Sequence, residues 1–233
     1  NLKDPPIDDT VQERRNDYDV ANLVQVSSPG SVRAAVKDIF QDSYPGGSFD
    51  AVWLAFHDFE RFFNGREPDY HGVDTTYHDI QHTLDMTLAL ARLISGYEQS
   101  VPANERLGPE RASLGLITAL FHDSGYLRHR ENDRDAVNGA EFTRSHVTRS
   151  AEFLTAYLPR VGLEDFAPVA NRIVHFTGYE IDIDKIELDK PKDSMIGHFL
   201  GTADLIAQLA DRCYLEKCRD RLFPEFILGG VAI

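Results

Sequence analysis

The sequence predicts an all-α fold, with one helical domain over residues 31–233 behind a polar leader over residues 1–30. From Ser31 onward, nearly every apolar segment repeats at the three- and four-residue spacing of a helix. Only residues 180–189 alternate like a strand, and a solvated loop or small hairpin accounts for them better than a sheet does. No internal repeat or second apolar region divides the chain, whose 233 residues can bury a core without disulfides.

Four helices are predicted in the first half of the domain, each from an apolar stripe with an end signal. In chain order they cover residues 31–41, 49–64, 78–95 and 108–123. Gly96 is the expected C-terminal cap of the third helix, because glycine readily adopts the left-handed conformation that closes many helices. Pro109 suits the first turn of the fourth helix, where its missing N–H is not needed.

The second half of the domain is also predicted to be helical. Asn138, followed three residues later by Glu141, forms a capping pattern for a helix that ends before Pro159. Further helices are expected over residues 164–177, 193–217 and 219–227.

Composition and charge exclude several classes of function. The chain carries 24 Lys and Arg against 38 Asp and Glu, a formal charge of −14, which argues against binding a nucleic-acid polymer. Cys213 and Cys218 lie in one predicted helix and make no disulfide framework, so a reducing compartment is expected. No apolar run approaches a membrane span and no signal peptide is recognisable, so a cytoplasmic protein without a membrane partner is predicted.

Two ionisable residues sit where the core is expected. Asp204 lies mid-helix within the apolar run 201–210, where burial of a lone carboxylate would cost several kcal/mol. Because no basic residue follows before Arg212, a metal ion is a better partner for it than a salt bridge. His146 shares its predicted helix face with aromatic residues and must also point inward.

Further histidines and acids lie at spacings that suit a common ion. His78 and His82 are four residues apart, so they share one face of a predicted helix, and Asp85 lies one turn further on, where it could orient His82. His122 and Asp123 end the most apolar helix, where both can turn toward one ion. Imidazole and carboxylate donors together favour Fe, Mn, Zn or Co over Ca.

These motifs resemble those of the HD-domain superfamily of metal-dependent phosphohydrolases. The shared order is His82, then His122-Asp123, then Asp204, each on a separate predicted helix. Residues 77–85, Tyr-His-x-x-x-His-x-x-Asp, are similar to the first metal motif of the cyclic nucleotide phosphodiesterases, and residues 122–126, His-Asp-Ser-Gly-Tyr, to the bacterial branch. The resemblance implies a helical bundle around a buried metal site.

The resemblance also implies roles for individual residues between about residues 75 and 225. A first metal would be held by His82, His122, Asp123 and Asp204. Asp123 would bridge to a second metal, completed by His146 and His175. His78 matches the histidine that protonates the leaving oxygen, which makes His78 and Asp123 the expected catalytic residues. The expected cofactors are one or two divalent ions per chain, among Mn, Fe, Mg, Zn and Co.

The function implied is a phosphohydrolase or phosphodiesterase. It would hydrolyse a small, nucleotide-like phosphate ester with a metal-activated water. Five arginines in the densest basic stretch are candidates for binding a distal phosphate, and the alternative for each is an ion pair on a solvated face; they are Arg128, Arg130, Arg134, Arg144 and Arg149.

Two other functions remain open from the sequence. The same six ligands in a di-iron form resemble the mixed-valent oxygenases of this superfamily, which cleave C–H bonds with O₂. A sensor domain that binds a nucleotide without turnover is the third possibility, against which the complete ligand set argues. The remaining histidines are expected to be surface or structural residues; they are His57, His71, His129 and His198.

Overall fold

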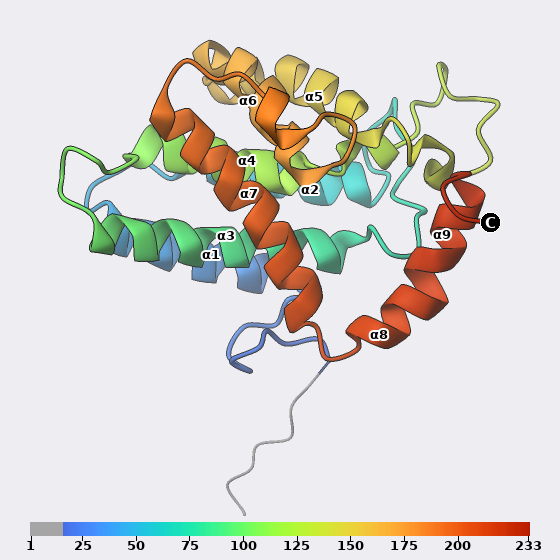
Figure 1. Cartoon of the computed structure of the whole chain (residues 1–233), viewed down its shortest axis with the longest axis horizontal. Helices are drawn as coiled ribbons and strands as arrows, with labels where there is room; N and C mark the ends of the chain where they lie inside the picture. Colours follow the sequence, from blue (N-terminus) through green and yellow to red (C-terminus); the bar gives the residue numbers. More distant parts are fainter. Residues whose placement is uncertain (1–15) are drawn as a thin grey trace, which may run out of the picture.

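Helices form most of the described backbone, as the spacing of apolar residues predicts. A computed structural model describes residues 16–233, which consist of helices joined by turns and loops (Figure 1). Within these residues, extended pairing is limited to two isolated β-bridges, which join Tyr18 to Gln25 and Tyr70 to His129. The prediction of an all-α fold is therefore confirmed.

The helices follow one another along the chain, and the longest connection, residues 122–145, separates α4 from α5. Their bounds are α1 (Pro29–Ser43), α2 (Asp50–Phe63), α3 (Ile80–Ser100), α4 (Pro109–Phe121), α5 (His146–Tyr157), α6 (Ala167–Ile173), α7 (Pro191–Ala210), α8 (Tyr214–Lys217) and α9 (Phe223–Leu228). A π-helical turn, Cys218–Leu222, joins α8 to α9. The 3₁₀ turns lie between α4 and α7, two in each connection, at Ser124–Tyr126, Gly139–Phe142, Leu158–Val161, Glu164–Phe166, Val174–Thr177 and Ile183–Lys185.

Local sequence signals account for where α1 and α3 begin. The Ser28 side chain accepts a hydrogen bond from the backbone N–H of Ser31, and Pro29 occupies the first position of α1. The Asp79 carboxylate accepts a hydrogen bond from the backbone N–H of His82, at 2.9 Å, and so caps α3. This cap places His82 in the first turn of α3.

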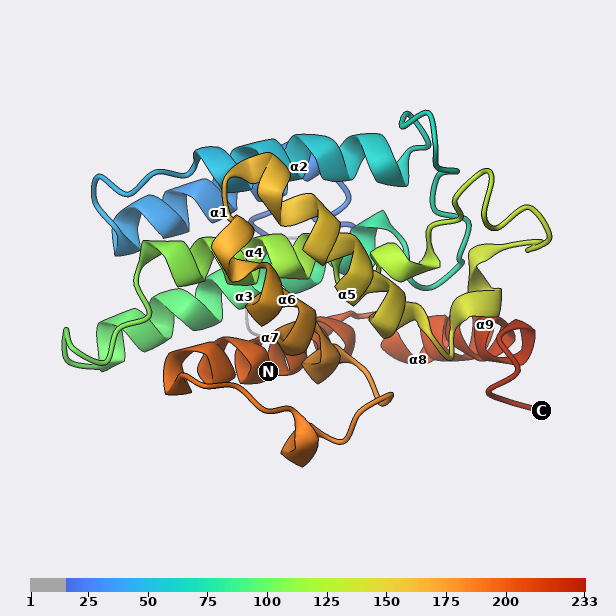
Figure 2. The same cartoon turned by 90° about the horizontal axis from the view of Figure 1, so that it is seen from above.

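Helix α4 occupies the centre of the bundle. Every residue from Ala112 to Phe121 is buried, because α2, α3, α5, α6 and α7 all pack against this helix. Figure 2 shows α1 and α2 on one side of the bundle, and α7, α8 and α9 on the opposite side. Because α3 and α4 run antiparallel, the first turn of α3 lies beside the end of α4, where the rings of His82 and His122 are 5.5 Å apart.

The third helix is longer than the sequence predicts. Helix α3 continues through Gly96 to Ser100, so the prediction that Gly96 is its C-terminal cap is wrong. The added turn is held by tertiary contacts: the Tyr97 ring packs against Phe199, and the buried carboxylate of Glu98 accepts a hydrogen bond from the N–H of Leu107. These contacts outweigh the low helix propensity of one glycine.

Two predicted helices are interrupted by turns. The Asn138 side chain caps only a 3₁₀ turn, and the Glu141 carboxylate accepts from the N–H of Val137 instead of closing a capping box on Asn138, so α5 begins later, at His146. The predicted helix over residues 164–177 divides into two 3₁₀ turns on either side of α6.

The helix predicted over residues 193–217 ends at Ala210. Asp211 is extended, and its carboxylate binds the N–H of Cys213 and the Lys217 ammonium, which redirects the chain into α8. Cys213 therefore lies in the turn before α8, apart from the helix in which it was predicted. Residues 180–189 form a loop with one 3₁₀ turn, as predicted.

The described part of the leader, residues 16–28, packs onto α3. The Asp19 carboxylate accepts hydrogen bonds from the N–H groups of Leu23 and Val24 and pairs with Arg92 of α3 at 2.6 Å. Val26 is buried beside α1. The rest of the predicted leader, residues 1–15, lies outside the described residues. Within residues 16–233, no helix combines the length and the apolar character that a membrane span requires.

Two glycines provide a matched test of this packing. A Cβ at Gly125 would lie 1.9 Å from the carbonyl oxygen of His146, whereas a Cβ at Gly96 would meet no atom within 4 Å. We therefore expect Gly125→Ala to destabilise the protein by roughly 1–3 kcal/mol, because backbone must move. Gly96→Ala should stabilise it by about 0.5–1 kcal/mol through helix propensity. Urea denaturation measures both changes, and equal stability of the two variants would contradict the close approach at Gly125.

Candidate metal centre

Four ionisable side chains from α3, α4 and α7 meet at one end of the bundle. His82 extends from the first turn of α3, His122 and Asp123 follow the last residue of α4, and Asp204 extends from α7. One ligand atom from each of His82, His122 and Asp204 lies within 4.8 Å of the others, so these three residues could hold a metal ion. The sequence predicted all three as ligands of the first metal.

The backbone of α4 orients the His122 ring. Nδ1 of His122 lies 2.7 Å from the carbonyl oxygen of Ala119, one turn earlier, and therefore donates its proton to that oxygen. The lone pair of the neutral ring is then on Nε2, the atom that faces the carboxylate of Asp123 at 3.1 Å. A hydrogen bond from the distal ring nitrogen to a carbonyl is the arrangement that typically orients a metal-binding histidine.

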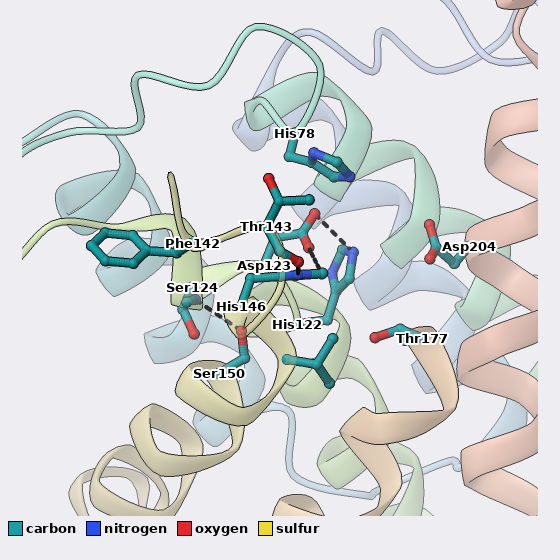
Figure 3. Close-up of polar contacts among 12 residues, drawn as sticks. His78, His122, Asp123, Ser124, Phe142, Thr143, His146, Ser150, Thr177 and Asp204 are labelled. Atoms are coloured by element: carbon teal, nitrogen blue, oxygen red, sulfur yellow. Dashed lines mark hydrogen bonds and ion pairs between the residues drawn. The ribbon is translucent and has the colours of Figure 1, made fainter. Parts of the chain in front are cut away.

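Asp123 lies at the middle of the cluster. Its Oδ2 is 3.6 Å from Nε2 of His82 and its Oδ1 is 3.8 Å from Nε2 of His146, while Oδ1 of Asp204 is 3.2 Å from Nε2 of His82. Figure 3 shows Asp123 directed at the His122 ring, with Asp204 and Thr177 bordering the same space from the other side. The two carboxylates thus approach the imidazoles from opposite sides.

Several of these atoms are buried without a hydrogen bond. They are Nε2 of His122, Oδ2 of Asp123 and Oδ1 of Asp204. The first two approach one another closely enough for an ion pair, but no hydrogen bond of acceptable geometry joins them. Leaving a buried acceptor unpaired is costly, and a cation would satisfy all three atoms at once. The donor set therefore fits a divalent metal ion.

The mutual effects of these groups on pKa are large. Burial alone would raise the pKa of Asp123, but the nearby rings of His122, His78 and His82 reverse this and hold its pKa far below the usual range. Burial alone would lower the pKa of His122, but the carboxylates of Asp123 and Asp204 raise it to about 9. The Asp123 carboxylate is therefore ionised, and it favours whichever positive charge, proton or metal, occupies the centre.

The two residues predicted to complete a second metal site differ in position. His146, at the start of α5, donates from Nδ1 to the carbonyl oxygen of Thr143 at 2.8 Å, which leaves Nε2 facing Asp123. His175 is buried in the 3₁₀ turn Val174–Thr177 with its Nδ1 unpaired, and no ion-pair contact with Asp123 joins it to the cluster in the described chain. A second metal therefore stays a prediction.

His78, the expected proton donor, lies beside the cluster and is held by a residue that the sequence analysis missed. The Glu225 carboxylate of α9 is buried, pairs with Nδ1 of His78 and accepts a hydrogen bond from the N–H of Tyr77 at 2.9 Å. The His78 ring stacks on Tyr126 at a centroid distance of 4.6 Å. The available signal was the single acid within the apolar stretch Phe223–Leu228.

Asp85 does not join the cluster as suggested. No hydrogen bond between described residues links it to His82; it lines a cavity of about 270 Å³ between α3, α7 and residues 16–20. Burial, and then the Asp211 carboxylate, raise the pKa of Asp85 to about 7, against the opposing effect of Lys217. Its spacing from His82 was compatible with contact, but the side chain belongs to a different face of α3.

The arginines proposed for a distal phosphate are occupied elsewhere. Arg128 pairs with Asp74, and Arg149 binds the Asp133 carboxylate together with the carbonyl oxygens of Gly125 and Leu127. The other three contact backbone or ring acceptors: Arg130 at His71, Arg134 at Glu131 and Arg144 at Gly230. Arg128 and Arg149 thus match the alternative of ion pairing with acids.

Metal removal should lower the thermal stability of the protein. Because the ligands come from three helices, a bound ion stabilises only the folded state, by about 2.7 kcal/mol when it is present at 100 times its dissociation constant. We expect EDTA to lower the melting temperature by several degrees and Asp204→Asn to abolish the effect. Asp182→Asn, an exposed position, is the control. An unchanged melting temperature in protein shown to have lost its metal would contradict the prediction that a metal ion bound by these helices stabilises the fold.

Asp85 should make stability depend on pH. Its carboxyl binds a proton more tightly in the folded state, so ionisation destabilises the fold increasingly between about pH 4 and pH 7 and by a constant amount above pH 7. Asp85→Asn should gain stability over the parent protein by up to about 1.4 kcal/mol per pH unit across that window. Urea denaturation at pH 5 and pH 8 measures the difference in unfolding free energy between Asp85→Asn and the parent protein. An equal difference at both pH values would disprove the raised pKa of Asp85.

Comparison with known proteins identifies no relative of this chain. No protein-family model matches the chain, and no curated protein or solved structure matches it. The support for the candidate metal centre therefore comes from its own side chains alone. Membership of the HD-domain superfamily stays an expectation from the sequence motifs.

Proposed function

We propose that the protein is a metal-dependent hydrolase of small phosphate esters. The observation that carries this proposal is the set of two imidazoles and two carboxylates, with buried and unpaired donor atoms, at the end of α4. The order of these residues in the sequence, which resembles the HD-domain phosphohydrolases, supports the same reaction class.

The donor set indicates which residues would hold the ion. His82, His122 and Asp204 would be ligands, and Asp123 lies close enough to join them. A divalent cation bound there supplies Lewis acidity that favours attack on a phosphoryl group. Nitrogen and oxygen donors in this proportion suit Mn, Fe, Zn or Co better than Ca.

His78 is suited to hold the proton that the leaving group needs. The Glu225 carboxylate binds Nδ1 and fixes the ring, so Nε2 remains available to a substrate. Burial alone would lower the pKa of His78, but the carboxylates of Asp123 and Glu225 outweigh it and raise the pKa above its usual value. The raised pKa favours the charged ring, which is the form that a general acid needs.

The proposal is tested on the intact protein, purified without chelator. Its metal content is determined first, and the stripped protein is then reloaded separately with Mn, Mg, Zn, Co or Fe(II). We expect release of inorganic phosphate from phosphate esters with at least one of these ions, and none from Asp204→Asn. Iron-loaded protein that consumes O₂ but releases no phosphate would overturn the proposal in favour of the oxygenase. Inactivity with every ion would also overturn it.

Replacing His78 separates proton transfer from metal binding. His78→Ala should keep its metal but lose roughly 10²–10⁴-fold in turnover on alkyl phosphates, whose alkoxide leaving group needs a proton. Hydrolysis of p-nitrophenyl phosphate should fall much less, because this leaving group needs little protonation. His57→Ala, an exposed histidine, is the control and should leave both rates unchanged.

Two measurements on the His78 variant decide its role: metal content and the ratio of the rates on alkyl and aryl esters. Loss of metal would show that His78 is a ligand. Equal losses on both esters, with metal retained, would leave His78 a positioning role only.

A further inference from the structure

A cavity of about 330 Å³ lies directly beside the metal centre, and Asp204 forms part of its wall. The 3₁₀ turn that ends at Thr177 and the loop that reaches Ile183 form one side, and α7 forms the other. Figure 3 places Asp204 and Thr177 at the border of the space in front of His122. A molecule bound in this cavity would therefore contact Asp204, one of the candidate metal ligands.

Two glycines of α7 fix the shape of this cavity. A Cβ at Gly201 would lie 2.5 Å from the carbonyl oxygen of Phe176, and a Cβ at Gly197 would lie 2.5 Å from the Phe176 ring. The absence of both side chains lets the 3₁₀ turn press against α7. The Phe176 ring also contacts His198 edge to face, at a centroid distance of 4.8 Å. The cavity thus has one well-fixed aromatic wall.

The lining is mainly apolar, and the imidazole of His198 is part of it. Phe176, Ile183 and Leu205 supply apolar surface, while Thr177 and Thr202 supply hydroxyl groups. Among the described residues that line the cavity, none is Lys or Arg, and the only carboxylate is that of Asp204. A second phosphate or another anionic group would find no Lys or Arg to pair with here and would be repelled by Asp204.

The contacts of Arg128 and Arg149 also argue against a second anionic group on the substrate. Arg128 and Arg149, two of the candidates for binding a distal phosphate, are already paired with Asp74 and Asp133. Neither is therefore free to bind a second anionic group of a substrate at this centre.

We infer that this cavity binds the organic group of a phosphate monoester, and that this group is uncharged and has an apolar or aromatic face. The inference rests on the proposed function, because it places the phosphate at the metal centre. Ligand pockets of about 300–1,000 Å³ hold drug-sized molecules, so a cavity near the lower limit suits one or two rings. The substrate class is then an aryl or nucleoside-sized monophosphate, and polyphosphates are excluded.

Binding of phosphonates that cannot be hydrolysed tests this inference without relying on turnover. Calorimetry on the metal-loaded protein compares methylphosphonate, phenylphosphonate and 4-carboxyphenylphosphonate. We expect phenylphosphonate to bind at least tenfold more tightly than methylphosphonate, because its ring fills the cavity. The added carboxylate should weaken binding relative to phenylphosphonate.

A matched pair of variants locates the effect. Leu205→Asn changes the cavity wall, whereas Leu209→Asn changes a residue of similar exposure one turn further along α7, outside the cavity. The preference for phenyl over methyl should fall toward one in Leu205→Asn and persist in Leu209→Asn. Equal affinities of the two phosphonates for the parent protein would overturn the inference. An unchanged preference in Leu205→Asn, or failure of either phosphonate to bind, would overturn it as well.

The outcome can be separated from that of the proposed function. A phenyl preference that depends on Leu205, in a protein that hydrolyses no ester, would support the cavity and overturn the hydrolase. Hydrolysis of a phosphate ester, without any preference for phenylphosphonate over methylphosphonate, would support the hydrolase and overturn the inference about the cavity.

Discussion

The attraction between buried carboxylates and imidazoles at the end of α4 is the constraint on which this end of the molecule depends. Other helices enclose α4 on all sides, so His122 and Asp123, which directly follow it, are buried in the interior. A carboxylate there requires positive charge nearby. The rings of His122 and His78, whose pKa values are raised by the nearby carboxylates, supply part of it, and α7 adds a second carboxylate, Asp204, that increases the demand for a cation.

The aromatic residues around the centre restrict how its histidines can move. The Tyr126 ring stacks on His78 and on His146, at centroid distances of 4.6 and 4.4 Å. Backbone carbonyls fix the rings of His122 and His146 through Nδ1. The rings of His78, His122 and His146 are therefore oriented by the protein itself, which reduces the entropy that binding would otherwise cost.

Much of the fold and part of the site could be predicted from the sequence, for different physical reasons. The helical spacing of apolar residues reports which face of each helix is buried, and it predicted the helices well. It does not report tertiary contacts, so the continuation of α3 past Gly96 and the break at Asp211 were missed. At the site, Asp204 was found because a carboxylate in apolar surroundings needs a partner, His122 because it ends the most apolar helix, and His82 because of its spacing from His78. Glu225 was missed because its partner, His78, is 147 residues away in the sequence.

That separation between His78 and Glu225 bears on how the protein is made. Because the pairing closes a loop of 147 residues, it is a late event in folding, and its loop-closure entropy must be offset by contacts formed earlier. During synthesis, α3, α4 and α5 emerge from the ribosome and can pack well before α9 exists. A nascent chain therefore carries His78 without its carboxylate partner for most of its translation. The last described helix, α9, completes the site by bringing Glu225 to His78 after the other helices have been made.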